Sequence, residues 1–384
     1  MTKFLQRDAQ TEIEKHLFQG KVIRIYGLRR TGKTTLAKEI LSKFGDINAY
    51  FNCEIIRHKA MFESLDVDKI KEYFGNHKIV VLDEAQNVSQ IGRMLKLMVD
   101  TYPEIQIIAT GSSSFEIANQ TGEPLVGRAF TYTLFPVSLQ ELKHNYSGFE
   151  LLKMRDDLLR FGSMPNVFGL SAIEKINFLD EITSSYLYKD ILEYENVKSS
   201  GILIKLLKAL ALQIGSEISY REIGQLIGIS PQTVEKYIWL LEKTFIIFSL
   251  SSLSRNLRNE LKRSTKIYFW DLGVRNSLLQ NFLPLDQRAD LGAIWENFCI
   301  SERLKQSSFG QFYNSNSYFW RTTTQQEIDF IQEKNGILTA FEFKYNSKKQ
   351  AKIPELFAKA YPNHQWKLIS IENWLDLTTV LPTP

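Results

Sequence analysis

The chain has 384 residues, of which 44% are hydrophobic and 23% are charged, with a formal net charge of +4. This composition is ordinary for a folded globular protein of two or three domains, and the mild charge neither demands nor excludes a nucleic-acid partner. No stretch comes near the roughly 18 continuous apolar residues that a membrane span needs. The two cysteines lack a metal-type spacing and the first residues lack an apolar leader, so we expect a cytoplasmic protein without disulfides.

A glycine-rich loop near the N-terminus is the most specific motif in the sequence. Residues 22–26 read VIRIY and predict a buried strand, because β-branched and aromatic residues dominate them. Residues 27–35 read GLRRTGKTT, and residues 36–41 predict a helix. A strand, then G-x-x-x-x-G-K-T, then a helix is typical of a phosphate-binding P-loop.

The residue types in this loop match the chemistry of phosphate binding. Gly27 and Gly32 allow backbone conformations that a Cβ forbids, so that successive N–H groups can surround a phosphate. The N-terminus of the following helix adds its partial positive charge. We expect Lys33 to reach the β- and γ-phosphates and Thr34 to hold Mg²⁺.

A second strand motif supplies two acidic residues. Residues 78–86 read KIVVLDEAQ, an apolar run that ends in Asp83 and Glu84, as in a Walker B motif. A buried strand would deliver both carboxylates to its C-terminal edge, where open α/β sheets bind ligands. We expect Asp83 to hold the Mg²⁺ shell and Glu84 to orient and deprotonate the attacking water.

Two further segments offer residues that contact phosphate. Residues 104–114 predict a strand that ends in hydroxyls, where Thr110 or Ser112 would sense the γ-phosphate or would simply cap a turn. Arg128 follows a glycine and would act as an arginine finger, in cis or from a neighbouring subunit, or would form an ordinary surface ion pair.

Strands that alternate with helices predict a doubly wound, mostly parallel sheet for residues 1–145. This domain resembles an AAA+-type ATPase of the additional-strand, catalytic-glutamate class. In particular, it is similar to a prokaryotic group with a G-x-R-R-x-G-K-T loop, an Asp-Glu-Ala-Gln Walker B motif and a Thr-Gly-Ser-Ser run. The resemblance implies ATP and Mg²⁺ as cofactors and places Arg29 and Arg30 near the nucleotide. The expected nucleotide-binding residues are Gly27, Arg29, Arg30, Thr31, Gly32, Lys33, Thr34, Thr35 and Thr110, and the expected catalytic residues are Glu84, Lys33 and Arg128.

The middle of the chain predicts a helical lid or linker at 146–200 and a winged helix-turn-helix at 201–275. The helix that starts at Pro231 would read a major groove, or the module would dock proteins instead. The groove-facing residues would be Ser230, Gln232, Thr233, Lys236 and Tyr237. The basic wing that would contact phosphates contains Arg255, Arg258, Lys262, Arg263 and Lys266.

Residues 276–384 carry a second acidic pattern, on a helix followed by a hairpin with an Asn-Gly turn. Glu342 and Lys344 leave the same face of one strand, and Asp329 lies on the neighbouring strand. The order Glu296, Asp329, Glu342-x-Lys344 resembles the PD-(D/E)XK nuclease superfamily, although Ile328 replaces the usual proline. The resemblance implies a metal held by Glu296, Asp329 and Glu342 with Lys344 catalytic; a cross-strand ion pair is the alternative.

The sequence as a whole predicts an α/β protein, with a P-loop sheet followed by a helical linker, a winged helix and a nuclease-like domain. The expected function is Mg²⁺-dependent ATP hydrolysis that acts on nucleic acid, with a C-terminal nuclease-like site. The alternative is a nucleotide-controlled switch that binds protein partners and has an inactive nuclease-like domain. Both a ring-forming oligomer and a monomer are compatible with this architecture.

Overall fold

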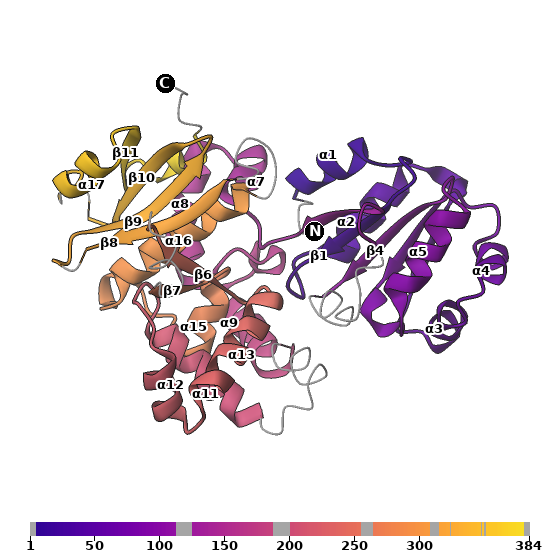
Figure 1. Ribbon diagram of the computed structural model, residues 1–384, viewed down its shortest axis with the longest axis horizontal. Coiled ribbons are helices and arrows are strands. Elements are labelled where there is room, and N and C mark those ends of the chain that lie inside the picture. Colours follow the sequence, from indigo (N-terminus) through magenta and orange to yellow (C-terminus); the bar gives the residue numbers. More distant parts are fainter. Residues whose placement is uncertain are drawn as a thin grey trace. The chain divides into compact units, whose positions relative to one another are not determined.

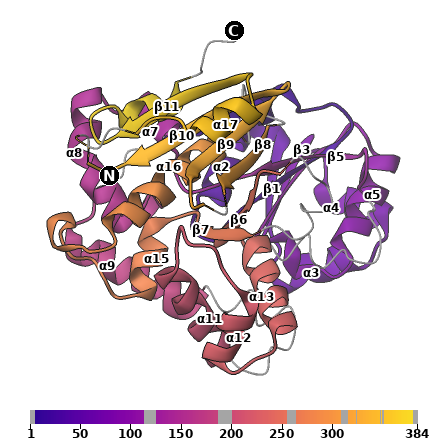
Figure 2. The same ribbon diagram turned by 60° about the vertical axis from the view of Figure 1, so that its left-hand side comes forward.

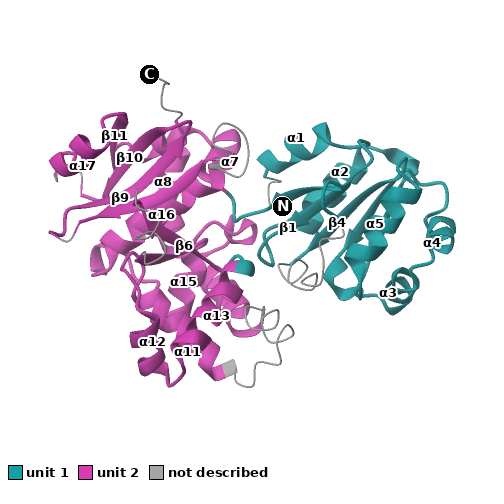
Figure 3. Ribbon diagram, in the orientation of Figure 1, with its two compact units in different colours: residues 1–137, 186–198, 243–245 teal, residues 138–185, 199–242, 246–384 magenta. Residues whose placement is uncertain are grey.

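The computed structural model describes residues 5–112, 125–186, 200–254, 264–307, 315–322, 324–346, 348 and 351–379. The chain divides into two compact units (Figure 3). Unit 1 contains residues 1–137 with the short segments 186–198 and 243–245, and unit 2 contains residues 138–185, 199–242 and 246–384.

Unit 1 is built on a parallel sheet with the order β2-β3-β4-β1-β5 (Figure 1). Its strands are β1 (Val22–Tyr26), β2 (Asn48–Asn52), β3 (Ile79–Asp83), β4 (Gln106–Gly111) and β5 (Ala129–Thr133). Its helices are α1 (Asp8–Lys15), α2 (Lys33–Ser42), α3 (Ile56–Glu63), α4 (Val67–Phe74) and α5 (Ile91–Thr101). The predicted parallel sheet is confirmed, and β4 lies between the P-loop strand β1 and the acidic strand β3.

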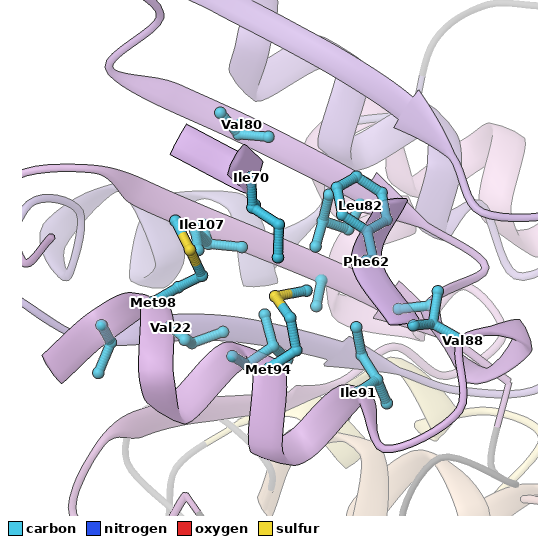
Figure 4. Close-up of a cluster of buried hydrophobic side chains, with 14 of the residues drawn as sticks. Val22, Phe62, Ile70, Val80, Leu82, Val88, Ile91, Met94, Met98 and Ile107 are labelled. Carbon is cyan, nitrogen blue, oxygen red and sulfur yellow. The ribbon is translucent and has the colours of Figure 1, made fainter. Parts of the chain in front are cut away.

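Alternation along the strands divides the core of this sheet between its two faces. Val80 and Leu82 of β3 pack with Met94 and Met98 of α5, as Figure 4 shows. Side chains two residues apart share a face, so Asp83 points to the opposite face from Leu82. The apolar residues of α5 therefore anchor the sheet from one side, and the acidic strand end is free to face the other.

Unit 2 contains a mixed sheet with the order β11-β10-β9-β8-β6-β7, whose strands β8 to β11 lie side by side in Figure 2. Its strands are β6 (Ile247–Ser252), β7 (Thr265–Phe269), β8 (Asn316–Arg321), β9 (Glu327–Lys334), β10 (Ile337–Lys344) and β11 (His364–Ser370). The β6–β7, β8–β9 and β9–β10 pairs are antiparallel, whereas β6–β8 and β10–β11 are parallel. The sheet thus includes strands from both sides of the domain boundary expected at residue 275.

Three helices of unit 2 begin with a capping box, in which Ser138, Ser147 or Ser171 pairs with the glutamate three residues later. These three are α7 (Leu139–Asn145), α8 (Gly148–Phe161) and α9 (Ala172–Glu181). The unit also contains α11 (Ser200–Leu212), α12 (Tyr220–Ile227), α13 (Pro231–Lys243), α15 (Leu272–Leu278), α16 (Leu291–Ser307) and α17 (Glu355–Ala360). Within the described ranges, no helix combines the length and the apolar character needed to cross a bilayer.

Candidate functional site

The two loop glycines adopt conformations that require glycine. Gly27 has a φ of 145°, and a Cβ at this position would lie 2.1 Å from the carbonyl oxygen of Leu134. Gly32 has a φ of 94° and directly precedes the first residue of α2. The chain that follows β5 therefore approaches the loop closely, and this approach leaves no room for a side chain.

The side chain of Lys33 folds back into the loop formed by residues 27–32. Its side chain is buried, and Nζ donates hydrogen bonds to the carbonyl oxygens of Gly27 at 2.8 Å and Leu28 at 3.0 Å. The ammonium group is thus held where the loop would surround a phosphate. Its contact with the β- and γ-phosphates stays a prediction.

A buried arginine that the sequence did not indicate supports the loop. Arg7 donates to the carbonyl oxygens of Thr31 and Phe135, both at 2.7 Å. The Thr31 hydroxyl donates to the carbonyl oxygen of Leu28 at 2.8 Å. Arg7 stands before the first helix and has no motif around it, so only the tertiary structure shows its role. Of the other predicted loop residues, Arg29 is half-buried, whereas Arg30 and Thr35 are exposed.

Asp83 ends β3 and is surrounded by hydroxyl groups. Thr34 Oγ1 lies 3.0 Å and 2.9 Å from the two carboxylate oxygens, Tyr50 Oη donates to Oδ2 at 2.5 Å, and Thr110 Oγ1 donates to Oδ1. Asp83 is 3% exposed, and a buried carboxylate needs such donors because it has lost water. The structure therefore brings together Thr34, Asp83 and Thr110, as the motifs predict, and adds Tyr50.

Glu84 follows in a left-handed conformation with a φ of 53°. Its N–H donates to Thr110 Oγ1 at 3.3 Å, and its carboxylate accepts a hydrogen bond from Gln86 Nε2. A non-glycine residue in this conformation carries strain of about 1–3 kcal/mol, which clusters at functional sites. The Gln86 contact and the turn directly after Asp83 define the position of the Glu84 carboxylate.

The hydroxyls at the end of β4 differ in their surroundings. Thr110 lies within the strand and bonds to Asp83 and Glu84, so it is not a helix cap. Ser112 is also buried, and its Oγ has no hydrogen-bond partner within the described residues. Contact of either group with a γ-phosphate stays a prediction.

Arg128 forms a surface ion pair. Its Nε lies 2.6 Å from Asp100 Oδ1, and both side chains are 41% exposed. This is the arrangement expected of an ordinary surface arginine, and the arginine-finger role of Arg128 stays a prediction.

Burial and the charges of Asp83 and Glu84 raise the pKa values of two neighbouring groups. Burial, followed by the hydrogen bond to Asp83 and its charge, raises the pKa of Tyr50 above its ordinary value. Burial and the charges of Asp83 and Glu84 raise the pKa of the Cys53 thiol to about 12. Both groups therefore stay protonated near neutral pH, and the Cys53 thiol is unreactive.

The second acidic pattern lies in unit 2, on strands β9 and β10. Asp329 Oδ2 accepts a hydrogen bond from the N–H of Phe343 at 2.8 Å, and Lys344 Nζ lies 2.5 Å from Glu342 Oε1. Glu342 Oε2 is buried without a hydrogen-bond partner in the described part of the chain. Burial first, and then the charges of Glu296 and Glu342, raise the pKa of Asp329 well above its usual range.

Glu296 on α16 faces a different set of partners. Its Oε1 accepts from Tyr268 Oη at 2.6 Å and lies 3.2 Å from Lys266 Nζ, which also pairs with Glu327. Lys266 is 2% exposed, so the prediction that it contacts phosphates on a solvated wing is wrong. It is buried because β7 contacts α16 and bridges to Glu217. The other wing residues, Arg255, Arg258, Lys262 and Arg263, lie outside the described residues.

The carboxylates of unit 2 do not form a three-residue metal cage. Throughout the described ranges, no three or more His, Cys, Asp or Glu side chains are grouped so that they would hold a metal ion. The charges of Glu296 and Glu342 both act on Asp329, but the described hydrogen-bond and ion-pair partners of Glu296 are Tyr268 and Lys266. Metal binding by Glu296, Asp329 and Glu342, and catalysis by Lys344, stay predictions.

Comparison with protein families matches three successive regions of the chain. Residues 19–143 match a family described as an AAA domain. Residues 153–285 match a domain of unknown function (DUF8612), and residues 291–375 match another (DUF4143). The AAA match covers the P-loop, the acidic strand β3 and the sheet of unit 1.

Two uncharacterized proteins are similar to this chain over most of its length. An uncharacterized protein of Mycobacterium tuberculosis is 23% identical over 346 residues, which is 89% of this chain and 74% of that protein. An uncharacterized protein of Methanocaldococcus jannaschii is 26% identical over 374 residues, covering 91% of this chain and 80% of that protein. The Thermotoga maritima RuvB Holliday junction branch migration motor is 14% identical with a TM-score of 0.32, covering 67% of this chain and 95% of that chain. The chain thus combines a region similar to AAA domains with two regions similar to families of unknown function.

Proposed function

We propose that this chain binds ATP with Mg²⁺ at the P-loop and hydrolyses it. The observation that carries the proposal is the convergence of Thr34 and Asp83, whose hydroxyl and carboxylate oxygens lie 2.9–3.0 Å apart although they come from different elements. The similarity of residues 19–143 to AAA domains supports the same function.

The residues around the loop fit a magnesium nucleotide. Gly27 and Gly32 both have positive φ values, of 145° and 94°, and such a glycine-rich turn before a helix can direct backbone N–H groups towards a phosphate. Thr34 and Asp83 would hold the metal, directly or through water. When bound, Mg²⁺ neutralises charge on the β- and γ-phosphate oxygens.

The remaining steps belong to the chain's own side chains. Lys33 would exchange its contacts with the Gly27 and Leu28 carbonyls for phosphate oxygens. Glu84, oriented by Gln86, would accept the proton of the attacking water. The left-handed turn at Glu84 supports this role, because strained backbone conformations of this kind cluster at functional sites.

The test compares nucleotide binding and phosphate release in three proteins. Lys33→Ala is expected to lose nucleotide binding, and Glu84→Gln is expected to bind ATP but to release phosphate at least about 100-fold more slowly. Glu39→Gln, an exchange on the same helix as Lys33 but beyond its first turn, is the control and keeps both activities. Normal phosphate release by Glu84→Gln would remove the proposed base.

A second candidate function, cleavage of nucleic acid, is supported by one observation in unit 2. The buried and unpartnered Glu342 Oε2 next to Asp329 is an acceptor that a divalent cation would satisfy. Asp329 and Glu342 would hold the cation, and Lys344 would stabilise developing charge. Plasmid nicking with Mg²⁺ or Mn²⁺ is expected to stop in Glu342→Gln and to continue in Glu355→Gln, an exchange at an exposed glutamate of α17.

Contact with nucleic acid would use the helices α12 and α13 as a helix-turn-helix. Gln232 and Lys236 are exposed on α13, and Ser230 Oγ caps this helix by accepting from the Thr233 N–H at 3.1 Å. Stimulation of ATP hydrolysis by DNA or RNA would favour this function. Hydrolysis that is indifferent to both would favour the alternative, a nucleotide-controlled switch that binds protein partners.

A further inference from the structure

We infer that Tyr50 is a positioning residue for the magnesium side of the nucleotide site, because its hydroxyl fixes the carboxylate of Asp83. This inference rests on the proposed function. It adds to the P-loop and the acidic strand a residue from β2 that belongs to neither motif.

The register of the parallel strands brings the two side chains together. Tyr50 pairs with Val81 and Asn52 pairs with Asp83, so Tyr50 and Asp83 lie two residues apart on the same face of the sheet. The phenol spans this offset, and its Oη lies 2.5 Å from Asp83 Oδ2. A hydroxyl bonded to a carboxylate at this distance forms a strong, charge-assisted hydrogen bond.

Tyr50 does what the other two donors of Asp83 cannot do. Thr110 holds Oδ1, and Thr34 carries a single proton for both oxygens, from which it lies 3.0 Å and 2.9 Å. Thr34 is also the residue that would bind the metal. Tyr50 is therefore the donor that keeps Oδ2 in place when the Thr34 hydroxyl turns to the cation.

The Tyr50 ring has a contact of its own that is separate from the hydroxyl. Lys38 Nζ lies 4.4 Å from the centre of the Tyr50 ring, one helical turn after Thr34 on α2. This cation–π contact holds the ring without using the hydroxyl. Tyr50→Phe therefore removes the hydrogen bond and leaves the ring contact.

The test measures how the affinity for a fluorescent ATP analogue depends on Mg²⁺. Loss of an outer-shell partner of a metal ligand typically costs roughly 10- to 100-fold in metal affinity. We expect Tyr50→Phe to need about ten times more Mg²⁺ than the wild type for half of the Mg²⁺-dependent gain in affinity for the analogue. Its affinity for the analogue in EDTA is expected to stay at the wild-type value. The matched control is Tyr102→Phe, because Tyr102 Oη also donates to a carboxylate at 2.5 Å, that of Asp68.

Two results would overturn the inference alone. The first is a Mg²⁺ requirement of Tyr50→Phe that is the same as, or lower than, that of Tyr102→Phe. The second is a loss of nucleotide affinity in Tyr50→Phe that is equal with and without Mg²⁺, as in a purely structural role. A wild-type protein that binds the analogue without any dependence on Mg²⁺, or does not bind it, would instead contradict the proposed function, and the inference would fall with it.

Discussion

The close approach between Gly27 and Leu134 makes the P-loop glycine a structural requirement as well as a functional one. In Gly27→Ala, the new Cβ would lie 2.1 Å from the Leu134 carbonyl oxygen, which belongs to backbone and cannot turn aside. The φ of 145° adds conformational strain, of about 1–3 kcal/mol. The overlap adds a further ~1–3 kcal/mol, as overpacking in a core does. We therefore expect unit 1 to lose about 2–6 kcal/mol of stability, independent of any nucleotide.

Gly45→Ala is the matched control for this change. Gly45 also has a positive φ, of 49°, but a Cβ there would have no heavy atom within 4 Å. This variant carries the cost of the left-handed conformation alone, about 1–2 kcal/mol. The difference between the two variants therefore reports mainly the overlap with Leu134, together with the difference between their φ values.

The assay must separate the two units, because a chain with two units need not unfold in a single step. The six tryptophans are Trp239, Trp270, Trp295, Trp320, Trp366 and Trp374, and all belong to unit 2. Tryptophan fluorescence in urea therefore reports on unit 2, and hydrogen exchange of peptides from β1, β3 and β4 reports on unit 1. We expect Gly27→Ala to lose protection in these strands while the fluorescence transition stays in place. Equal protection in Gly27→Ala and Gly45→Ala would refute the reasoning, because the Leu134 backbone would then have moved away at little cost.

Three further predictions concern buried charges and thiols. Lys266→Met leaves Glu296 and Glu327 without their shared cation, so we expect the tryptophan transition in urea to lose about 3 kcal/mol; a loss below ~1 kcal/mol would contradict the role of Lys266 in the buried network. Burial alone would raise the pKa of Asp290, but hydrogen bonds from Arg288 and Arg275 outweigh it and lower the pKa to about 2. The stability that this ionised Asp290 contributes is present above the unfolded-state pKa and is lost as the pH falls from about 4 towards 2. Asp290→Asn is expected to flatten this part of the pH dependence of stability. An unchanged pH profile would be evidence against the contribution of Asp290. Both cysteines are buried with raised thiol pKa values, so we expect a thiol reagent at pH 8 to label neither before denaturation.

Local sequence patterns predicted the individual elements of this fold well. The run at 22–26 is a strand with the predicted bounds, and the apolar run before Asp83 is β3. These strands are short, apolar and followed by clear loop signals, so neighbouring residues suffice to identify them. The meeting of Thr34 and Asp83 could also be expected, because both lie at ends of elements that a P-loop sheet brings to one edge.

Long-range pairing is what the local patterns did not reveal. Ser251 of β6 pairs with Tyr318 of β8, a parallel contact between segments that are far apart in the sequence. This pairing makes the β6–β7 hairpin part of the larger sheet and buries Lys266 beneath α16. In the sequence, Lys266 follows other basic residues, and such a run fits a solvated wing as well as it fits a strand with a buried lysine. Tyr50 was missed for a related reason, since its hydroxyl reaches Asp83 only through the register of β2 against β3.

The two acidic clusters of the chain differ in how their charge is balanced. The hydrogen-bond partners of the Asp83 carboxylate in the described structure are hydroxyl groups, which hold the carboxylate but bring no positive charge. Its charge is therefore available to a divalent cation. In unit 2, Lys344 pairs with Glu342 and Lys266 pairs with Glu296, so the protein supplies its own cations to two of the three carboxylates. A metal bound there must compete with these ammonium groups, whereas the described hydrogen-bond partners of the Asp83 carboxylate are the hydroxyl oxygens of Thr34, Tyr50 and Thr110.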